Sequence, residues 1–280
     1  MSISIFARPY FLGQELSTGE PYLHRVTSLV RGEQIAEYIG GKYNPTSGYE
    51  NDVCIYHKPK RLDHIKDTSY VDVSDADCLV EQLQHRPQIK VIASSQCSYE
   101  FLKEKLKNEI VLIPEHHCNF ERVVRERKTI TTGGIIGHPS VFSGPVNDEI
   151  RKQLEEIGLK FITCFNYKNR QDSINFYKQI DFQVIGHFGY LNNYDPFNHP
   201  SKMINAASFG IPTIANWKLG YKEFEGSYIP VRTMDSLVAE AEKMKNENYY
   251  NEWADKIIKE AEKYHISKVA EMYKQLEMTV

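Results

Sequence analysis

Residues 198–215 place polar side chains directly in front of an apolar helical pattern. Asn198, His199 and Ser201 precede or open the helix, and Lys202 follows at once. The first turn of a helix exposes unpaired N–H groups and a partial positive charge, which together attract phosphate. We therefore predict a phosphate site at this turn, with Lys202 adding a full positive charge.

A second loop of small and polar residues occurs earlier in the same half of the chain. Gly137, His138 and Ser140 come directly after the apolar strand predicted at 132–136. Ligands of open α/β sheets lie beyond the carboxyl ends of the strands, so this loop and the turn at Lys202 are expected to meet at one crevice. Lys168, which follows the next predicted strand, would add a cation to the same pocket.

A third polar group, Glu115-His116-His117, follows the last strand predicted in the first half. A histidine titrates near neutral pH, so either ring, or the carboxylate beside them, is suited to take a proton from an acceptor hydroxyl. The alternative is that the histidines hydrogen-bond the backbone between two domains. Three adjacent residues do not supply the ligand geometry of a zinc site without a second ligand pair.

Asp75 and Asp77 form a D-x-D pattern, which holds a divalent cation in some sugar transferases. Ser74-Asp75 is equally suited to cap a helix, and three-residue matches are common by chance, so we assign no metal ligands. The G-x-x-x-x-G-K-[ST], G-x-S-x-G and G-x-G-x-x-G patterns do not occur where their folds need them. This disfavours a P-loop ATPase, a serine hydrolase and a dinucleotide-dependent dehydrogenase.

The elements that must position these residues alternate between strand and helix through most of the chain. Strands are predicted at 3–7, 53–56, 70–73, 90–93 and 110–113, and then at 132–136, 161–165, 182–185, 213–215 and 228–231. Helices are predicted at 28–39, 77–84, 99–106, 148–157, 171–180, 202–209 and 234–244, followed by an amphipathic tail at 249–278. This order predicts an α/β fold with two Rossmann-like domains, built on parallel sheets flanked by helices and facing across a cleft. The predicted boundaries are 1–125 for the first domain, 126–248 for the second, and 249–280 for a helical tail packed across both.

Composition and charge limit the partners and the cellular compartment that we expect for this chain. A formal net charge of -3 over 280 residues gives no overall basic footprint, which disfavours nucleic acid as a partner. The five cysteines are odd in number and form no C-x-x-C pair, so we expect reduced thiols and a cytoplasmic protein. The N-terminus lacks a signal-peptide core and no apolar run reaches about 18 residues, so we expect no membrane span, with peripheral membrane contact left open.

Residues 200–215 carry a specific resemblance. A polar loop and short helix followed by a small-Gly-x-Pro-x-apolar strand resemble the donor-binding motif of GT-B glycosyltransferases. By resemblance, Ser201 and Lys202 would contact the phosphates or ribose of a nucleotide-diphosphate sugar, and Asn205 would face the nucleotide. Many retaining members carry two glutamates seven residues apart here, whereas this chain has Phe197 and Asn205 at those positions.

The resemblance implies transfer of a sugar from a nucleotide-diphosphate donor to an acceptor hydroxyl, with the acceptor on the domain at 1–125 and the nucleotide sugar on the domain at 126–248. The leaving diphosphate would be stabilised by the helix N-terminus, Lys202 and loop N–H groups, without an obligatory metal or other cofactor. The acceptor would be a carbohydrate, a lipid-linked molecule or another hydroxyl compound. Two alternatives stay open, a GT-B-shaped nucleotide-sugar epimerase and a non-catalytic nucleotide-sugar-binding module.

Overall fold

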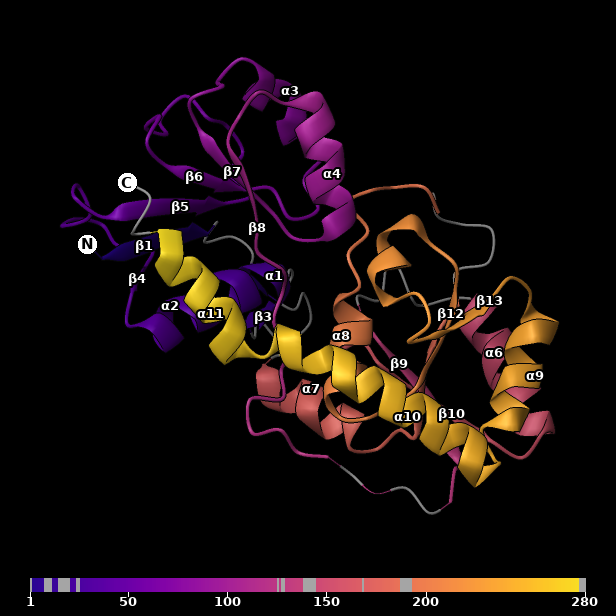
Figure 1. Ribbon diagram of the computed structural model, residues 1–280. Helices are drawn as coiled ribbons and strands as arrows, with labels where there is room; N and C mark the ends of the chain where they lie inside the picture. Colours follow the sequence, from indigo (N-terminus) through magenta and orange to yellow (C-terminus); the bar gives the residue numbers. More distant parts are fainter. Residues whose placement is uncertain are drawn as a thin grey trace.

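The computed structural model describes residues 2–7, 12–14, 21–23, 26–124, 126, 129–137, 145–167, 169–186 and 193–276. It shows two α/β lobes, joined by a crossover after β8 and spanned by the C-terminal helices (Figure 1). His138, Ser140 and Lys168, three of the predicted donor-binding residues, lie outside the described residues.

The first lobe is built on a six-stranded parallel sheet in the order β4-β1-β5-β6-β7-β8. Its strands are β1 (Ile3–Ala7), β4 (Lys42–Tyr43), β5 (Val53–His57), β6 (Tyr70–Asp72), β7 (Lys90–Ala93) and β8 (Ile110–Leu112). Its helical segments are α1 (Val26–Ser28), η2 (Leu29–Gln34), α2 (Ile35–Ile39), α3 (Leu79–Gln84) and α4 (Gln96–Lys105). A small antiparallel hairpin, β2 (Leu12–Gln14) with β3 (Pro21–Leu23), lies between β1 and α1 in sequence.

The second lobe repeats this topology in a five-stranded parallel sheet with the order β10-β9-β11-β12-β13. Its strands are β9 (Thr132–Ile136), β10 (Lys160–Cys164), β11 (Phe182–Ile185), β12 (Thr213–Asn216) and β13 (Ile229–Val231). Its helical segments are α6 (Pro145–Glu156), α7 (Arg170–Tyr177), α8 (Ser201–Ser208), the 3-10 helix η3 (Leu219–Phe224) and α9 (Met234–Lys243). In both sheets the second strand lies outside the first and the third lies on its other side, which creates the switch point where ligands of such sheets bind.

These observations confirm the predicted pair of Rossmann-like α/β units. The strands are buried on both faces, as parallel sheets require: Ile55, Val71 and Val91 are each at most 1% exposed in the first lobe. Phe182 and Ile214 are fully buried in the second. The domain boundaries at residues 125 and 248 stay predictions.

The C-terminal tail consists of α10 (Glu247–Ala261), the short η4 (Glu262–Tyr264) and α11 (Ile266–Gln275). Helix α10 runs along the second lobe and α11 along the first (Figure 1). Tyr250 and Ile257 of α10 pack into the core of the second lobe, whereas Val269 and Tyr273 of α11 pack with β1 and β5 of the first. The single tail helix that we predicted is interrupted, because His265 is extended and its ring accepts the Ser267 amide at the start of α11.

The predicted helix at 28–39 also differs in detail. Its middle, η2, is π-helical, and a π-turn widens the helix by one residue, which is frequent at functional sites. The widened turn carries Arg31, whose Nε donates to Asp72 at 2.7 Å, into the interior of the first lobe. The sequence gives no sign of β4 or of the β2–β3 hairpin, since strands of two or three residues are too short to show a period.

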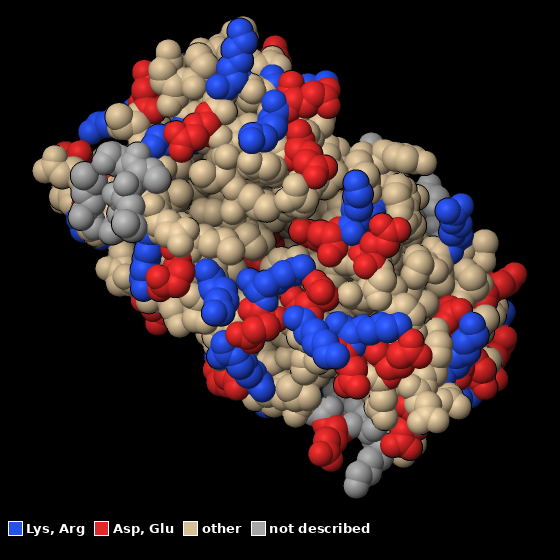
Figure 2. Space-filling model, viewed as in Figure 1, with Lys and Arg blue, Asp and Glu red and all other residues tan. Residues whose placement is uncertain are grey.

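The face of the molecule drawn in Figure 2 shows no continuous basic tract. Acidic and basic side chains are interspersed across both lobes (Figure 2). Within the described residues, no helix combines the length and the apolar character needed to cross a bilayer. The five cysteines, which all lie in described segments, carry free thiols.

Candidate functional site

Helix α8 opens at the carboxyl-terminal edge of the second sheet, where the sequence placed a phosphate site. Pro200 stands at its N-cap position without a side-chain cap, so the first N–H groups are not closed off by that residue. Met203 and Ala206 are fully buried and anchor the helix. Gly210 adopts φ +67° after the helix, as a left-handed C-terminal residue should, and Pro212 then leads into β12.

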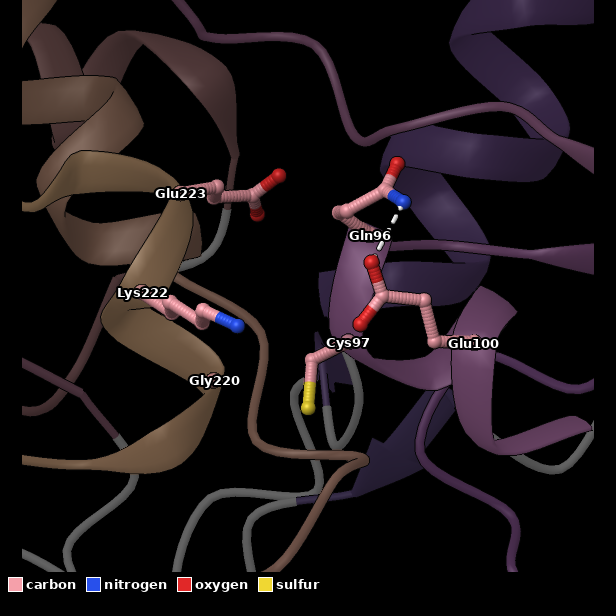
Figure 3. Close-up of a pocket in the computed structure, with 6 residues that line it drawn as sticks. All are labelled: Gln96, Cys97, Glu100, Gly220, Lys222 and Glu223. Carbon is pink, nitrogen blue, oxygen red and sulfur yellow. Dashed lines mark hydrogen bonds between the residues drawn. The ribbon is translucent and has the colours of Figure 1, made fainter.

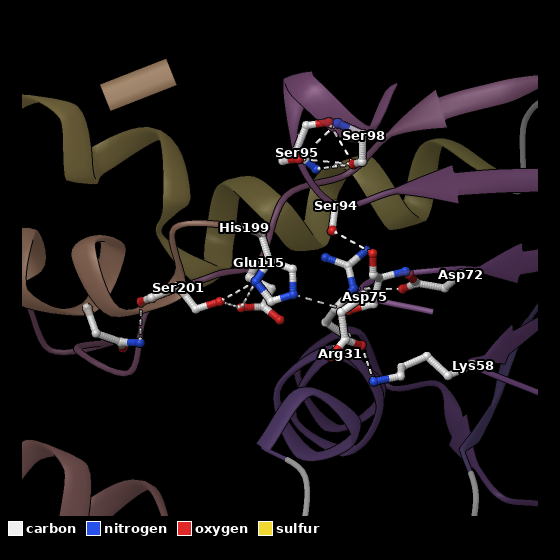
Figure 4. Close-up of polar contacts among 12 residues, drawn as sticks. Arg31, Lys58, Asp72, Asp75, Ser94, Ser95, Ser98, Glu115, His199 and Ser201 are labelled. Carbon is white, nitrogen blue, oxygen red and sulfur yellow. Dashed lines mark hydrogen bonds and ion pairs between the residues drawn. The ribbon is translucent and has the colours of Figure 1, made fainter. Parts of the chain in front are cut away.

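Glu115 meets His199 and Ser201 at this helix start, although it lies far from both in sequence (Figure 4). The Ser201 hydroxyl donates a short hydrogen bond to Glu115 Oε2. Because that proton is used, Ser201 Oγ accepts from His199 Nδ1, 2.6 Å away. His199 Nε2 is then left as the acceptor for the Ser74 hydroxyl at 3.4 Å. One chain of hydrogen bonds therefore joins the first lobe, the crossover and α8.

The first lobe presents a second polar cluster beside this chain. Burial alone would raise the pKa of Asp72, but attraction to Arg31 and to the His57 ring, whose Nδ1 lies 3.5 Å away, outweighs it and holds the pKa well below its usual range. Lys58 and Asp75 form a further ion pair at the same strand ends. Attraction to Lys58 overcomes the effect of burial and lowers the pKa of Asp75.

Two residues at these strand ends have unfavourable backbones. Lys58 and Ser74, directly beyond or near the ends of β5 and β6, have φ of +46° and +45°, a region that side chains other than glycine rarely adopt. Such conformations cost about 1–3 kcal/mol each and gather at binding sites. Their position on neighbouring strand ends marks the edge of the first sheet that faces α8.

Two lysines of the second lobe lie together at the helix start. Burial and then repulsion from Lys218 lower the pKa of Lys202 to about 8, with attraction to Glu115 opposing the shift. Burial likewise lowers the pKa of Lys218, which is 3% exposed, to about 8, with attraction to Asp195 opposing it. The neighbouring carboxylates Glu115 and Asp195 oppose these shifts without cancelling them. Lys218 was not predicted, although its place just after β12 was the available signal.

The Asn205 side chain and the Asn198 backbone both make close contacts within the protein. Asn205 Oδ1 accepts from the Cys118 amide at 2.7 Å and its Nδ2 donates to Ser201 O at 2.8 Å, so the amide ties α8 to the crossover. The Asn198 backbone lies so close to Gly220 that a Cβ on that glycine would fall 1.4 Å from Asn198 O. The nucleotide-facing role of Asn205 stays a prediction.

Phe197 explains why the first glutamate of the retaining motif is absent here. Its side chain is 4% exposed, packs with the first-lobe core around α4 and meets Phe101 edge-to-face at 5.5 Å. A carboxylate at this position would be buried in an apolar contact between lobes.

Gly137, also predicted to bind the donor, follows β9, and its backbone N–H donates to Cys164 O at 3.1 Å.

His116 and His117 turn away from the group around Glu115. His116 Nε2 lies 2.8 Å from Val30 O and its Nδ1 lies 3.1 Å from His117 O, while burial lowers its pKa. His117 is 2% exposed, and burial followed by repulsion from His265 lowers its pKa to about 3. Their predicted catalytic role stays a prediction, and Glu115 is the member of the three that reaches α8.

An aromatic pair, one ring exposed and the other partly buried, adjoins Lys218. Tyr194, 71% exposed, meets Trp217 edge-to-face with ring centroids 5.6 Å apart, and Trp217 directly precedes Lys218. Aromatic faces suit the stacking of a sugar ring or a base.

Among the described residues no group of three His, Cys, Asp or Glu side chains is arranged to hold a metal ion.

Comparison with protein-family models and with curated protein sequences finds no match. Solved structures do match. The pneumococcal O-GlcNAc transferase GtfA, in complex with UDP and GlcNAc, aligns with a TM-score of 0.57 at 14% identity over 81% of this chain. Anabaena HepE in complex with UDP and glucose gives 0.56 at 12% over 82%, and the trehalose-6-phosphate synthase OtsA gives 0.53 at 8% over 82%.

This chain spans 56% of GtfA, 72% of HepE and 73% of OtsA. At such identities the likeness concerns the fold alone. These structures are GT-B glycosyltransferases, and the two parallel sheets with repeated topology are shared with them. The chain therefore has the GT-B fold.

Proposed function

We propose that the protein is a glycosyltransferase that moves a sugar from a nucleotide-diphosphate donor to an acceptor hydroxyl and needs no metal ion. Two of the matched structures hold UDP together with a sugar, which supports UDP as the first nucleotide to test.

The observation that carries the proposal is the cation pair at the start of α8. Lys202 and Lys218 lie at the carboxyl-terminal edge of a parallel sheet, beside a helix N-terminus, and each has its pKa lowered to about 8. A bound diphosphate would add negative charge beside both lysines and accept hydrogen bonds from the first-turn amides of α8. Gly137, Asn198 and the residues at 138, 140 and 168 are proposed to complete the pocket.

Charge stabilisation is the chemistry that this pocket can supply. As the bond from the sugar to the diphosphate breaks, negative charge grows on the leaving phosphate, and fixed cations in a partly buried site stabilise it most at that stage. Glu115 is the proposed base for the acceptor hydroxyl, since its Oε1 is buried without a hydrogen-bond partner in the described part of the chain. The chain of Ser201 and His199 would hold its other oxygen in place.

A thermal-shift series tests the donor site. UDP, GDP and ADP are added to the full chain with and without EDTA, and a nucleotide that binds the native state raises the melting temperature by mass action. We expect one diphosphate to respond equally in EDTA, and Lys202→Met to remove most of that response. Lys256→Met, an exposed lysine on α10, is the matched control. An unchanged response in Lys202→Met would refute the pocket.

Product analysis then separates the three candidate activities. A transferase consumes the nucleotide sugar only with an acceptor, an epimerase converts it without one, and a binding module leaves it intact. Glu115→Gln should abolish transfer but keep the nucleotide response. His116→Asn and His117→Asn, assayed alongside, test the catalytic role predicted for those residues.

A further inference from the structure

A pocket of about 210 Å³ lies between the lobes, next to the proposed donor site but distinct from it (Figure 3). One wall is the first turns of α4, with Gln96, Cys97 and Glu100. The other is η3, with Gly220, Lys222 and Glu223. Since each lobe supplies one wall, the pocket exists only while the lobes keep this orientation.

The lining offers both donors and acceptors. Gln96 Nε2 donates to Glu100 Oε1 at 2.8 Å, so Gln96 Oε1 and Glu100 Oε2 take no part in this hydrogen bond. Glu223 Oε1 is buried and has no hydrogen-bond partner among the residues that the structure describes. An unsatisfied buried carboxylate oxygen is costly and is best relieved by a ligand or water that reaches it.

Glu223 can serve as either donor or acceptor near neutral pH. Burial raises the pKa of its carboxyl to about 7, while hydrogen bonding to the Gln96 backbone and Tyr264 and attraction to Lys263 oppose the rise. A hydroxyl group both donates and accepts, so it complements a carboxyl group in either protonation state.

The charge balance selects against anions. Two carboxyl groups, Glu100 and Glu223, face a single ammonium group, Lys222, whereas the neighbouring donor site carries two lysines. A phosphate or carboxylate would meet repulsion in this pocket. Its volume equals that of about seven waters at roughly 30 Å³ each, which suits a single ring better than a nucleotide.

Position relates the pocket to the donor site. Helix η3 begins directly after Lys218 and ends at the pocket, and Gly220 touches the Asn198 backbone of the donor loop. We propose that this pocket binds a neutral, hydroxyl-rich sugar ring of the acceptor, held by Glu100, Lys222 and Glu223. The assignment rests on the proposed transferase function, because it names the acceptor class for that activity.

Saturation-transfer NMR on the full, nucleotide-free chain tests this proposal. The probes are the methyl glycosides of glucose, galactose and N-acetylglucosamine, with glucose 6-phosphate as the charged comparison. We expect at least one neutral glycoside to bind and glucose 6-phosphate to bind at least tenfold more weakly. Gln96→Trp, which fills the pocket from an exposed position, and Glu223→Gln should each weaken glycoside binding at least tenfold. Glu104→Gln, on the same helix outside the pocket, should leave it unchanged.

The UDP thermal shift, measured on every variant, separates the two proposals and reports folding. If UDP still raises the melting temperature but no glycoside binds, or glycoside binding survives both pocket variants, the pocket assignment is overturned and the donor site stands. If a glycoside binds and is lost in Gln96→Trp while no nucleotide binds, the pocket assignment is supported and the donor site fails.

Discussion

Replacing Lys218 by Met should stabilise the empty protein and weaken nucleotide binding, two effects of opposite sign. The pKa of Lys218 falls from 10.5 to about 8 in the folded protein. At pH 7 the charged Lys218 therefore destabilises the folded state by at most about 3 kcal/mol, at 1.36 kcal/mol per pKa unit. Methionine removes that cost and keeps most of the side-chain volume.

The gain in stability should be visible in the melting temperature. We expect the free energy of unfolding of the nucleotide-free variant to rise by about 1–3 kcal/mol. For a chain of this size that corresponds to roughly 2–6 °C. The cost is present below pH 8 and vanishes above the unfolded pKa of 10.5, so the gain should shrink as the pH rises from 8 to 10.5.

The loss in binding follows from the same charge. A hydrogen bond to a charged phosphate in a partly buried site contributes about 1.5–3 kcal/mol. UDP affinity should therefore fall about 10- to 150-fold, at about 1.4 kcal/mol for each factor of ten. Differential scanning fluorimetry and calorimetric titration measure the two effects, with Lys256→Met as control. A variant that is less stable and still binds UDP normally would show that Lys218 is a structural lysine, and the reasoning would fail.

Three other outcomes are expected. UDP affinity should fall as the pH rises from 7.5 to 9.5, because Lys202 and Lys218, with pKa values lowered to about 8, lose their charge. Calorimetry in buffers of different ionisation enthalpy should detect proton uptake on binding, and a UDP affinity that does not change with pH would contradict this. Gly220→Ala should cost more than about 2 kcal/mol of unfolding free energy in urea, because its Cβ would fall 1.4 Å from Asn198 O, whereas a well-folded variant would show that the donor loop yields freely. Asp72→Asn should lower the free energy of unfolding by about 3–5 kcal/mol, because it leaves Arg31 buried without its counter-ion. Since the pKa of the Asp72 carboxyl is lowered in the folded protein, its contribution to stability is present above about pH 4 and is lost as the pH falls below that value. An unchanged acid-unfolding midpoint in the variant would refute the role assigned to this pair.

The fold could be predicted because each local pattern agreed with the whole. Buried parallel strands appear as short apolar runs, and the Gly210 and Pro212 signals end α8 where the structure ends it. The interruptions escaped prediction for a physical reason. Arg31 in the π-helical turn contacts Asp72, and His265 at the break contacts the Phe120 carbonyl oxygen; both partners lie too far away in the sequence for a local pattern to indicate them.

The site was predicted in part for the same reason. Glu115 was identified from its place after a strand, and His199 and Ser201 from their places at a helix start; the structure brings the three together. Lys218 and the aromatic pair were not predicted, because the sequence around them has neither a small-residue loop nor a helix-start pattern. Glu223 had no signal at all, because its neighbours come from the other lobe.

The account stands or falls with the place of the diphosphate. A crystal structure of the full chain soaked with UDP measures it directly. We predict phosphate oxygens within hydrogen-bond distance of the α8 first-turn amides and of the ammonium groups of Lys202 and Lys218. A nucleotide bound elsewhere on the protein, with α8 and both lysines unchanged, would contradict the account.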